Sequence, residues 1–207
     1  MLEIVLVRHG ATDWNVEGRC QGTTDLELNG VGIRQAQETA ASLREETIHA
    51  IYSSDLKRAQ QTARLIGDPH HLSVAIEPAV RELDHGELEG LTFSEIKDRY
   101  PVFIQGWRTA PAAIQIPGGE KLIDVAERAW EGLNRIALRH ESGETVILVS
   151  HNFPILSILC RITGTDLNQY RSFRLDPCGV TRLNCDNGTR WSVSQINNQH
   201  YSTDPLA

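Results

Sequence analysis

Short β-branched runs alternate with segments of helical periodicity along most of this chain, and this alternation constrains its fold more than any other feature. Strands are predicted at residues 2–8, 48–53, 73–77 and 145–150. Strands that alternate with helices ordinarily build a mostly parallel sheet that helices cover on both faces. We therefore predict an α/β fold with such a sheet.

Two further apolar runs, at residues 180–185 and 191–196, are predicted to be the closing strands. Residues 186–188 between them read Asp-Asn-Gly, a sequence typical of a tight hairpin turn. A hairpin pairs its strands in antiparallel fashion, so the sheet must contain at least one antiparallel strand. The polar tail at residues 197–207 is expected to be loosely held. No internal repeat or linker interrupts the sequence, and residues 1–207 are predicted to form a single domain.

Helices are expected between these strands, at residues 30–46, 55–66, 93–100, 122–139 and 153–162. Asn29 and Ser54 are predicted to be the N-cap residues of the first two helices. Pro101 is expected to end the third. Residues 10–28 are predicted to form a long loop, and residues 81–119 are expected to be the least regular part of the chain.

The charge pattern argues against a nucleic-acid partner. The formal net charge is −7, and the 20 lysines and arginines are scattered without a basic run, whereas a nucleic-acid-binding surface gathers positive charge. No apolar stretch approaches the ~20 residues of a membrane-spanning helix. Glu3 also interrupts the first apolar run, so we expect no signal peptide, no membrane partner and a cytoplasmic location.

Conspicuous polar side chains follow the predicted strands at the points where the strands end. Arg8 and His9 end the first strand, and His151 follows the fourth. Arg58 lies in the first turn of the helix after the second strand, and Glu82 follows the third. Ligands of open α/β sheets bind beyond the carboxyl ends of the strands, so we expect these side chains to meet in one pocket near the positive end of a helix.

These residue types together suit the chemistry of a phosphoryl group. Two guanidiniums offer forked donors that match phosphoryl oxygens. A neutral imidazole is a nucleophile at physiological pH, and a carboxyl group can protonate a leaving oxygen and later deprotonate water. The second imidazole can stabilise charge on the group in transfer.

The sequence around these residues resembles the histidine phosphatase superfamily, the phosphoglycerate-mutase-like proteins. Residues 8–15 read Arg-His-Gly-Ala-Thr-Asp-Trp-Asn, and residues 52–63 read Tyr-Ser-Ser-Asp-Leu-Lys-Arg-Ala-Gln-Gln-Thr-Ala. Further matching blocks occur in the family's order at residues 18–22, 81–90, 117–120 and 149–151. The resemblance implies a three-layer α/β/α sandwich and a reaction that needs neither a metal nor a cofactor.

The resemblance also implies a role for each candidate residue. His9 would be the nucleophile that becomes phosphohistidine, and Glu82 the proton donor and acceptor. The other residues of the phosphate pocket would be Arg8, Arg58 and His151. Three more residues would contact the phosphoryl group or the rest of the substrate, namely Asn15, Gln21 and Gly22.

Within the superfamily, the sequence favours the broad phosphatase branch. Phosphoglycerate mutases usually have Phe-Thr-Gly-Trp where residues 20–23 here read Cys-Gln-Gly-Thr, and their middle region is longer. We therefore predict a metal-independent phosphomonoesterase that acts on a small phosphorylated metabolite, as a monomer or a homodimer. The alternatives are a cofactor-dependent phosphoglycerate mutase and a catalytically inert module that binds a phosphorylated ligand.

Two positions depart from the family pattern, and two aromatic residues need an interpretation. Asn152 stands where glycine is common, and Lys121 stands where serine is common. His85 is expected at the rim of the pocket rather than in a metal site, because no metal-ligand spacing surrounds it. Among the tryptophans, Trp107 is the one expected to face a substrate.

Overall fold

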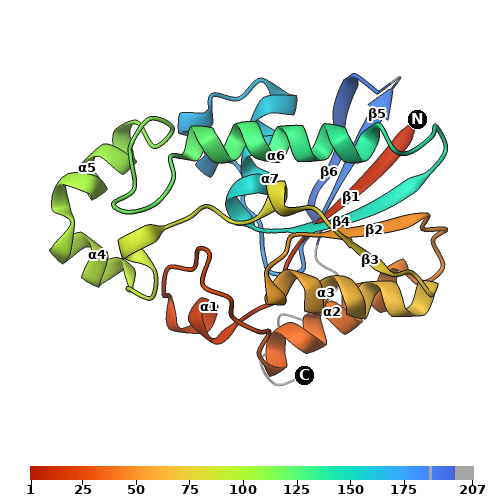
Figure 1. Ribbon diagram of the computed structural model, residues 1–207, viewed down its shortest axis with the longest axis horizontal. Coiled ribbons are helices and arrows are strands. Elements are labelled where there is room, and N and C mark those ends of the chain that lie inside the picture. Colours follow the sequence, from red (N-terminus) through yellow and green to blue (C-terminus); the bar gives the residue numbers. More distant parts are fainter. Residues whose placement is uncertain (187, 199–207) are drawn as a thin grey trace.

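The computed structural model of the chain describes residues 1–186 and 188–198. Its centre is a sheet of six strands in the order β3-β2-β4-β1-β5-β6 (Figure 1). The strands are β1 (Leu2–Arg8), β2 (Ala50–Ser53), β3 (Val74–Ile76), β4 (Thr145–Ser150), β5 (Val180–Asp186) and β6 (Arg190–Asn198).

The pairing of the strands confirms the predicted mixed sheet. β1 pairs with β4 in parallel, β4 pairs with β2, and β2 pairs with β3, also in parallel. β5 runs antiparallel to both β1 and β6. The predicted turn between β5 and β6 includes Asn187, and the predicted tail continues past residue 198, so both lie partly outside the described residues.

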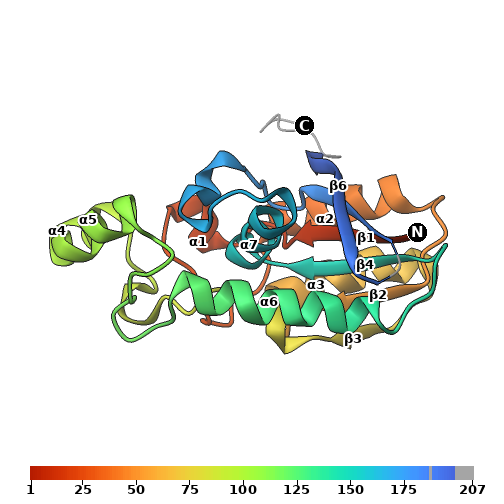
Figure 2. The same cartoon turned by 90° about the horizontal axis from the view of Figure 1, so that it is seen from above.

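Helices cover both faces of the sheet, which gives the three layers of the expected sandwich. Figures 1 and 2 show α2 and α3 on one face and α6 and α7 on the other. The helices are α1 (Asp13–Glu17), α2 (Gly30–Leu43), α3 (Lys57–Gly67), α4 (Phe93–Arg99), α5 (Pro101–Thr109), α6 (Leu122–Ala137) and α7 (Asn152–Thr163). Among the described residues, no helix is both long enough and apolar enough to span a membrane.

Alternation along the central strands builds two apolar cores. Val5 and Val7 of β1 pack in the cluster that includes residues of α2 and α3, whereas Ile4 and Leu6 pack with α6 and α7. All four side chains are completely buried. Each strand residue therefore belongs to one face or the other, as the two-residue period of a strand requires, and this fixes the register of the strands that carry the site.

The predicted loop at residues 10–28 is wrong in one part, because α1 lies within it. Thr12 caps this short helix: its hydroxyl accepts a hydrogen bond from the Asn15 backbone amide, and the Asn15 side chain accepts one from the Thr12 amide. Gly18 ends it with a φ of 66°, a left-handed conformation that glycine adopts without strain. Five residues are too few for a recognisable apolar period, and only the caps could have indicated this helix.

One prediction at a helix end is confirmed and another is wrong. Helix α4 ends at Arg99, just before Pro101, as expected, and Pro101 also begins α5, because the first turn of a helix needs no proline amide hydrogen. Ser54 does not cap α3, which starts at Lys57 after Leu56. The Ser54 hydroxyl instead contacts the His151 ring, so a partner far along the chain replaces the local cap.

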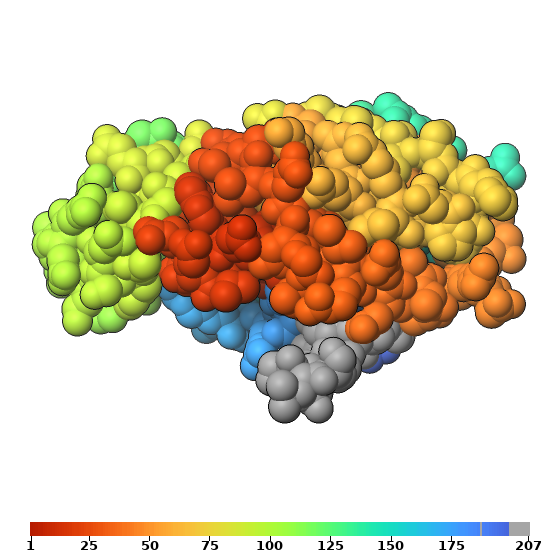
Figure 3. All heavy atoms as spheres, turned by 90° about the horizontal axis from the view of Figure 1, so that it is seen from below, coloured from red at the N-terminus to blue at the C-terminus, as the bar shows by residue number. Residues whose placement is uncertain are grey.

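Helices α4 and α5 form a lobe that extends beyond the end of the sheet (Figures 1 and 2). The lobe is joined to the segment after α1 by a backbone bridge between Arg19 and Thr92. In Figure 3 the residues around α1 (red) fill the space between this lobe (yellow-green) and α2 (orange). The lobe and the α1 segment together enclose the space beyond the strand ends.

Candidate active site

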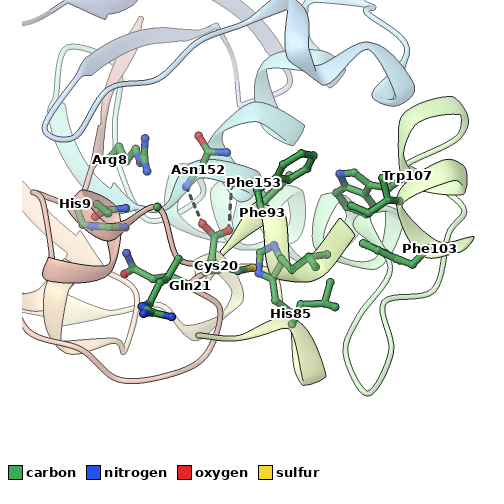
Figure 4. Close-up of a pocket in the computed structure, with 17 residues that line it drawn as sticks. Arg8, His9, Cys20, Gln21, His85, Phe93, Phe103, Trp107, Asn152 and Phe153 are labelled. Atoms are coloured by element: carbon green, nitrogen blue, oxygen red, sulfur yellow. Dashed lines mark hydrogen bonds between the residues drawn. The ribbon is translucent and has the colours of Figure 1, made fainter. Parts of the chain in front are cut away.

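A cavity of about 410 Å³ lies between the carboxyl ends of the central strands and the lobe (Figure 4). Three of the predicted catalytic residues, Arg8, His9 and Glu82, line it. The other two, Arg58 and His151, are fully buried beside His9. The structure thus brings together all five side chains that the sequence placed at strand ends.

The hydrogen bonds of His9 fix the role of each ring nitrogen. Nδ1 lies 2.7 Å from the carbonyl oxygen of Gly10, which can only accept, so Nδ1 carries the hydrogen. Arg58 Nε, which can only donate, lies 3.3 Å from His9 Nε2. Nε2 is therefore the atom with the lone pair, and it is the ring nitrogen available as a nucleophile.

The surroundings of His9 also keep its ring neutral. The side chain is buried, with 2% of its surface exposed. Burial lowers the pKa of His9 well below its ordinary value of 6.5, and the nearby charges of Arg58 and Arg8 lower it further. A neutral imidazole retains the lone pair that nucleophilic attack requires.

Arg58 is held by backbone carbonyls of the loop after α1. Its Nη1 donates to the carbonyl oxygen of Thr24 at 2.9 Å, and its Nη2 donates to that of Gly22 at 2.8 Å. The Glu89 carboxylate in turn accepts hydrogen bonds from the backbone amides of Thr23 and Thr24, at 2.6 and 2.8 Å. Sequence reasoning placed Gly22 near the substrate, but Gly22 is not among the residues that line the cavity.

His151 lies beside His9, with 5.1 Å between the ring centroids. Its Nε2 lies 2.5 Å from Ser54 Oγ, and among the described residues its buried Nδ1 has no hydrogen-bond partner. Burial lowers the pKa of His151 well below 6.5, and Arg58, His9 and Arg8 lower it further. If Ser54 donates to Nε2, Nδ1 carries a hydrogen that an anionic oxygen in the pocket can accept.

Glu82 sits at the N-terminus of α7. Its Oε2 accepts a hydrogen bond from the Asn152 amide, and its Oε1 accepts from the Phe153 amide, both at 3.1 Å (dashed lines in Figure 4). Oε1 also accepts from the Leu83 amide at 2.9 Å. At the position where the family commonly has glycine, Asn152 therefore contributes a backbone donor, and it is among the residues that line the cavity.

A clamp that sequence reasoning missed fixes the backbone around Glu82. Arg128 of α6 donates to the carbonyl oxygens of Ala79, Arg81 and Glu82 at 2.6 to 2.9 Å. The Arg128 guanidinium also forms two hydrogen bonds with the Glu120 carboxylate, at 3.0 and 2.8 Å. The matching block at residues 117–120 was the only sequence signal for this clamp.

Two of the predicted substrate-binding residues, Asn15 and Gln21, line the cavity. Gln21 Nε2 donates to Thr12 Oγ1 at 2.6 Å, and its buried Oε1 has no hydrogen-bond partner among the described residues. Lys121, whose role the sequence left open, is not among the lining residues and provides the N-cap position of α6.

His85 is more deeply placed than the predicted rim position. Only 7% of its surface is exposed, because its ring packs on Phe153 with 5.3 Å between centroids. Burial lowers the pKa of His85, so the ring is neutral, and it raises the pKa of the Cys20 thiol in the same cavity to about 12. Trp107 lines the cavity, as expected. Within residues 1–186 and 188–198 no cluster of three or more His, Cys, Asp or Glu side chains is arranged to hold a metal ion.

Comparison with known proteins links this site to one family. The family model for the histidine phosphatase superfamily (branch 1) matches residues 4–199. A protein named metal-independent phosphoserine phosphatase, from Arabidopsis thaliana, is 42% identical over 164 residues, which are 78% of this chain and 68% of that protein. A probable phosphoglycerate mutase, GpmB of Proteus mirabilis, is 32% identical over 208 residues, or 99% of this chain and 96% of its own length.

The fold is also found among solved structures. YhfR of Bacillus stearothermophilus superposes with a TM-score of 0.89 at 30% identity. The alignment covers 97% of this chain and 99% of YhfR, so the lobe and the sheet are both part of the shared architecture.

Proposed function

This chain belongs to the histidine phosphatase superfamily and is a phosphomonoester hydrolase, and we propose that it works through a phosphohistidine formed on His9. The observation that carries this proposal is the fixed tautomer of His9. The Gly10 carbonyl and the Arg58 guanidinium together leave a lone pair on Nε2 of a neutral ring. The substrate in this proposal is a small phosphorylated metabolite, because the cavity of about 410 Å³ has the size of a small-molecule site.

In the first step, His9 Nε2 attacks the phosphorus atom of the phosphoester. The nitrogen–phosphorus bond forms as the bond between phosphorus and the leaving oxygen breaks. The leaving oxygen takes a proton from the Glu82 carboxyl group, which lines the same cavity, and departs as an alcohol. Glu82 becomes a carboxylate, and hydrogen bonds from three backbone amides stabilise this negative charge.

In the second step, water attacks the phosphohistidine. The Glu82 carboxylate takes the proton of the water, the nitrogen–phosphorus bond breaks, and inorganic phosphate leaves with both His9 and Glu82 restored. Arg8, Arg58 and the His151 Nδ1 hydrogen stabilise the charge on the phosphoryl oxygens in both steps. The placement of these three groups around His9 supports these roles.

A mutase would also form phosphohistidine on His9, but it would then transfer the phosphoryl group to the free hydroxyl of a monophosphorylated ligand, so that the nitrogen–phosphorus bond breaks and a bisphosphorylated ligand forms in the site. Such a ligand needs cations for its second phosphate. The wall of the cavity away from the phosphate end is mainly apolar, and it includes Phe93, Phe103 and Trp107. This wall favours hydrolysis over phosphate return.

The test is release of inorganic phosphate from p-nitrophenyl phosphate and a panel that includes phosphoserine and 3-phosphoglycerate, measured in EDTA. We expect the wild-type protein to release phosphate and His9→Ala to lose all measurable turnover. His71→Asn is the matched control, because His71 is exposed, is not a lining residue of the cavity and has a left-handed backbone that asparagine tolerates. Isomerisation of 3-phosphoglycerate without net release, in the presence of bisphosphoglycerate, would assign the chain to the mutases instead.

A further inference from the structure

We propose that the leaving group of the natural phosphoester is uncharged and apolar, such as an alkyl or aryl group. This inference rests on the proposed phosphatase function and adds to it the chemical class of the substrate. The inference follows from the apolar wall of the cavity, on the side away from His9. Helices α4 and α5 and the start of α7 supply this wall with Phe93, Ile96, Phe103, Ile104, Trp107 and Phe153.

The aromatic members of this wall form a continuous surface. Phe103 stacks on Trp107 with 5.5 Å between the ring centroids, and Trp107 meets Phe153 edge-on at 5.9 Å. The indole nitrogen of Trp107 donates to the Tyr170 hydroxyl at 3.1 Å. This N–H group therefore donates to a residue that does not line the cavity, and Trp107 presents only carbon surface to a ligand. In Figure 4 these rings lie on the opposite side of the cavity from Arg8 and His9.

The charges near this wall do not suit an anionic leaving group. Apart from Arg8 at the phosphate end, Arg19 is the cation among the described lining residues. Its guanidinium pairs with Glu17 at 2.6 Å and with Glu95 at 3.8 Å, and it also donates to the Gly90 carbonyl. A carboxylate on the substrate would thus meet a cation that is already paired with two carboxylates, as well as the carboxyl group of Glu82.

Phe93 supplies a second, independent reason. It lines the cavity, yet 59% of its surface is exposed. A ligand that covers this ring removes apolar surface from water, which favours binding in proportion to the area buried. Two polar groups also line this cavity, the His85 ring and Gln21 Oε1, and Gln21 Oε1 has no hydrogen-bond partner among the described residues.

The experiment compares ethyl, butyl and hexyl phosphate with phosphoserine. The alkyl alcohols are similar leaving groups, so differences in kcat/KM report contacts with the wall rather than intrinsic reactivity. We expect kcat/KM to rise by about two- to fourfold for each added methylene, and hexyl phosphate to exceed phosphoserine. A flat series, or a preference for phosphoserine over hexyl phosphate, would overturn the inference while leaving the phosphatase function intact.

Phe93→Ala and Phe103→Ala locate the effect. Each is expected to lower kcat/KM for hexyl phosphate by about tenfold and to change that for ethyl phosphate by less than about twofold. Val102→Ala is the control: it removes apolar surface from the same helix as Phe103, but Val102 is 82% exposed and is not a lining residue. Equal losses for both substrates in the phenylalanine variants would indicate a structural defect and refute the inference. Absence of turnover with every phosphoester would refute the proposed function itself.

Discussion

His9 lies among cations and carbonyl groups that together decide its chemistry. The same two arginines that would bind a phosphoryl group also lower the pKa of the histidine, after burial, so that the ring stays neutral. The nucleophile is therefore expected to remain active at pH values below 6.5, where an ordinary histidine becomes charged. In a pH profile, the acid limb of kcat/KM due to His9 should lie well below 6.5, and a limb centred at 6.5 or above would contradict this account.

Ser54 controls the orientation of the second histidine. Replacing it with alanine removes the hydrogen-bond partner of His151 Nε2 and leaves a buried ring nitrogen unpaired. Without this bond the imidazole ring is no longer fixed with Nδ1 toward the phosphoryl group. We expect Ser54→Ala to lower kcat/KM by about tenfold. Steady-state kinetics with p-nitrophenyl phosphate measure the effect.

Ser157 offers a matched control for that substitution. It is also a buried serine, but its hydroxyl has no hydrogen-bond partner among the described residues, and it lies within α7 away from the cavity lining. Ser157→Ala should keep wild-type activity because it breaks no bond. Equal activities of the two alanine variants would mean that the Ser54 contact has no part in positioning His151.

At the scale of elements, the site is built where strands end and one helix begins. Arg8 is the last residue of β1 and His9 follows it, and His151 lies between the end of β4 and the start of α7. The first amides of α7 then hold Glu82, as the unsatisfied donors of a helix N-terminus would hold any carboxylate. Helix α6 completes the arrangement from the side through Arg128.

We predict that Arg128→Lys weakens catalysis through Glu82. Lysine keeps the charge but cannot replace a planar fork that contacts three carbonyls and one carboxylate. The backbone of Glu82 should become less well fixed, so kcat is expected to fall about tenfold and the free energy of unfolding by about 2 kcal/mol. Kinetics and urea unfolding measure the two effects.

Arg135→Lys is the control on the same helix. Arg135 forms two hydrogen bonds with the buried carboxylate of Glu77, and neither residue lines the cavity. Its kcat should stay within about twofold of the wild-type value. A similar loss of kcat in both lysine variants would show that α6 as a whole, rather than the clamp, supports the site.

The strands and the five catalytic candidates were predictable because each depends on local sequence. A β-branched run and the residue after it lie together in the chain, so His9 and His151 could be placed at strand ends. Ser54 and Arg128 could not be placed in this way. The partner of Ser54 lies 97 residues away, and Arg128 lies 46 residues from Glu82. Only the packing of α3, α6 and α7 on the sheet brings such residues together.

At the scale of the whole molecule, the buried histidines link stability to pH. His9 and His151 both have a pKa well below 6.5 in the folded protein, mainly because of burial. In the unfolded chain their pKa returns to about 6.5. Between these values the unfolded state binds more protons, so the free energy of unfolding is greatest above pH 6.5 and falls as the pH drops below it.

Denaturant unfolding at several pH values measures this dependence. Each neutral buried histidine should contribute up to about 1.4 kcal/mol per pH unit below 6.5. His151→Asn should flatten the slope, whereas His71→Asn should not, because His71 is exposed and asparagine tolerates its left-handed backbone. A wild-type slope that is flat from about pH 7.5 to 5.5 would contradict the assigned neutral state of these rings.

Trapping the phosphorylated enzyme tests the central claim most directly. Protein that is turning over p-nitrophenyl phosphate is quenched with alkaline denaturant, which preserves phosphohistidine, and its peptides are mapped by mass spectrometry. We predict one phosphoryl group on His9 in the wild-type protein and none in His9→Ala. A phosphoryl group on another residue, or phosphate release that persists in His9→Ala, would contradict it.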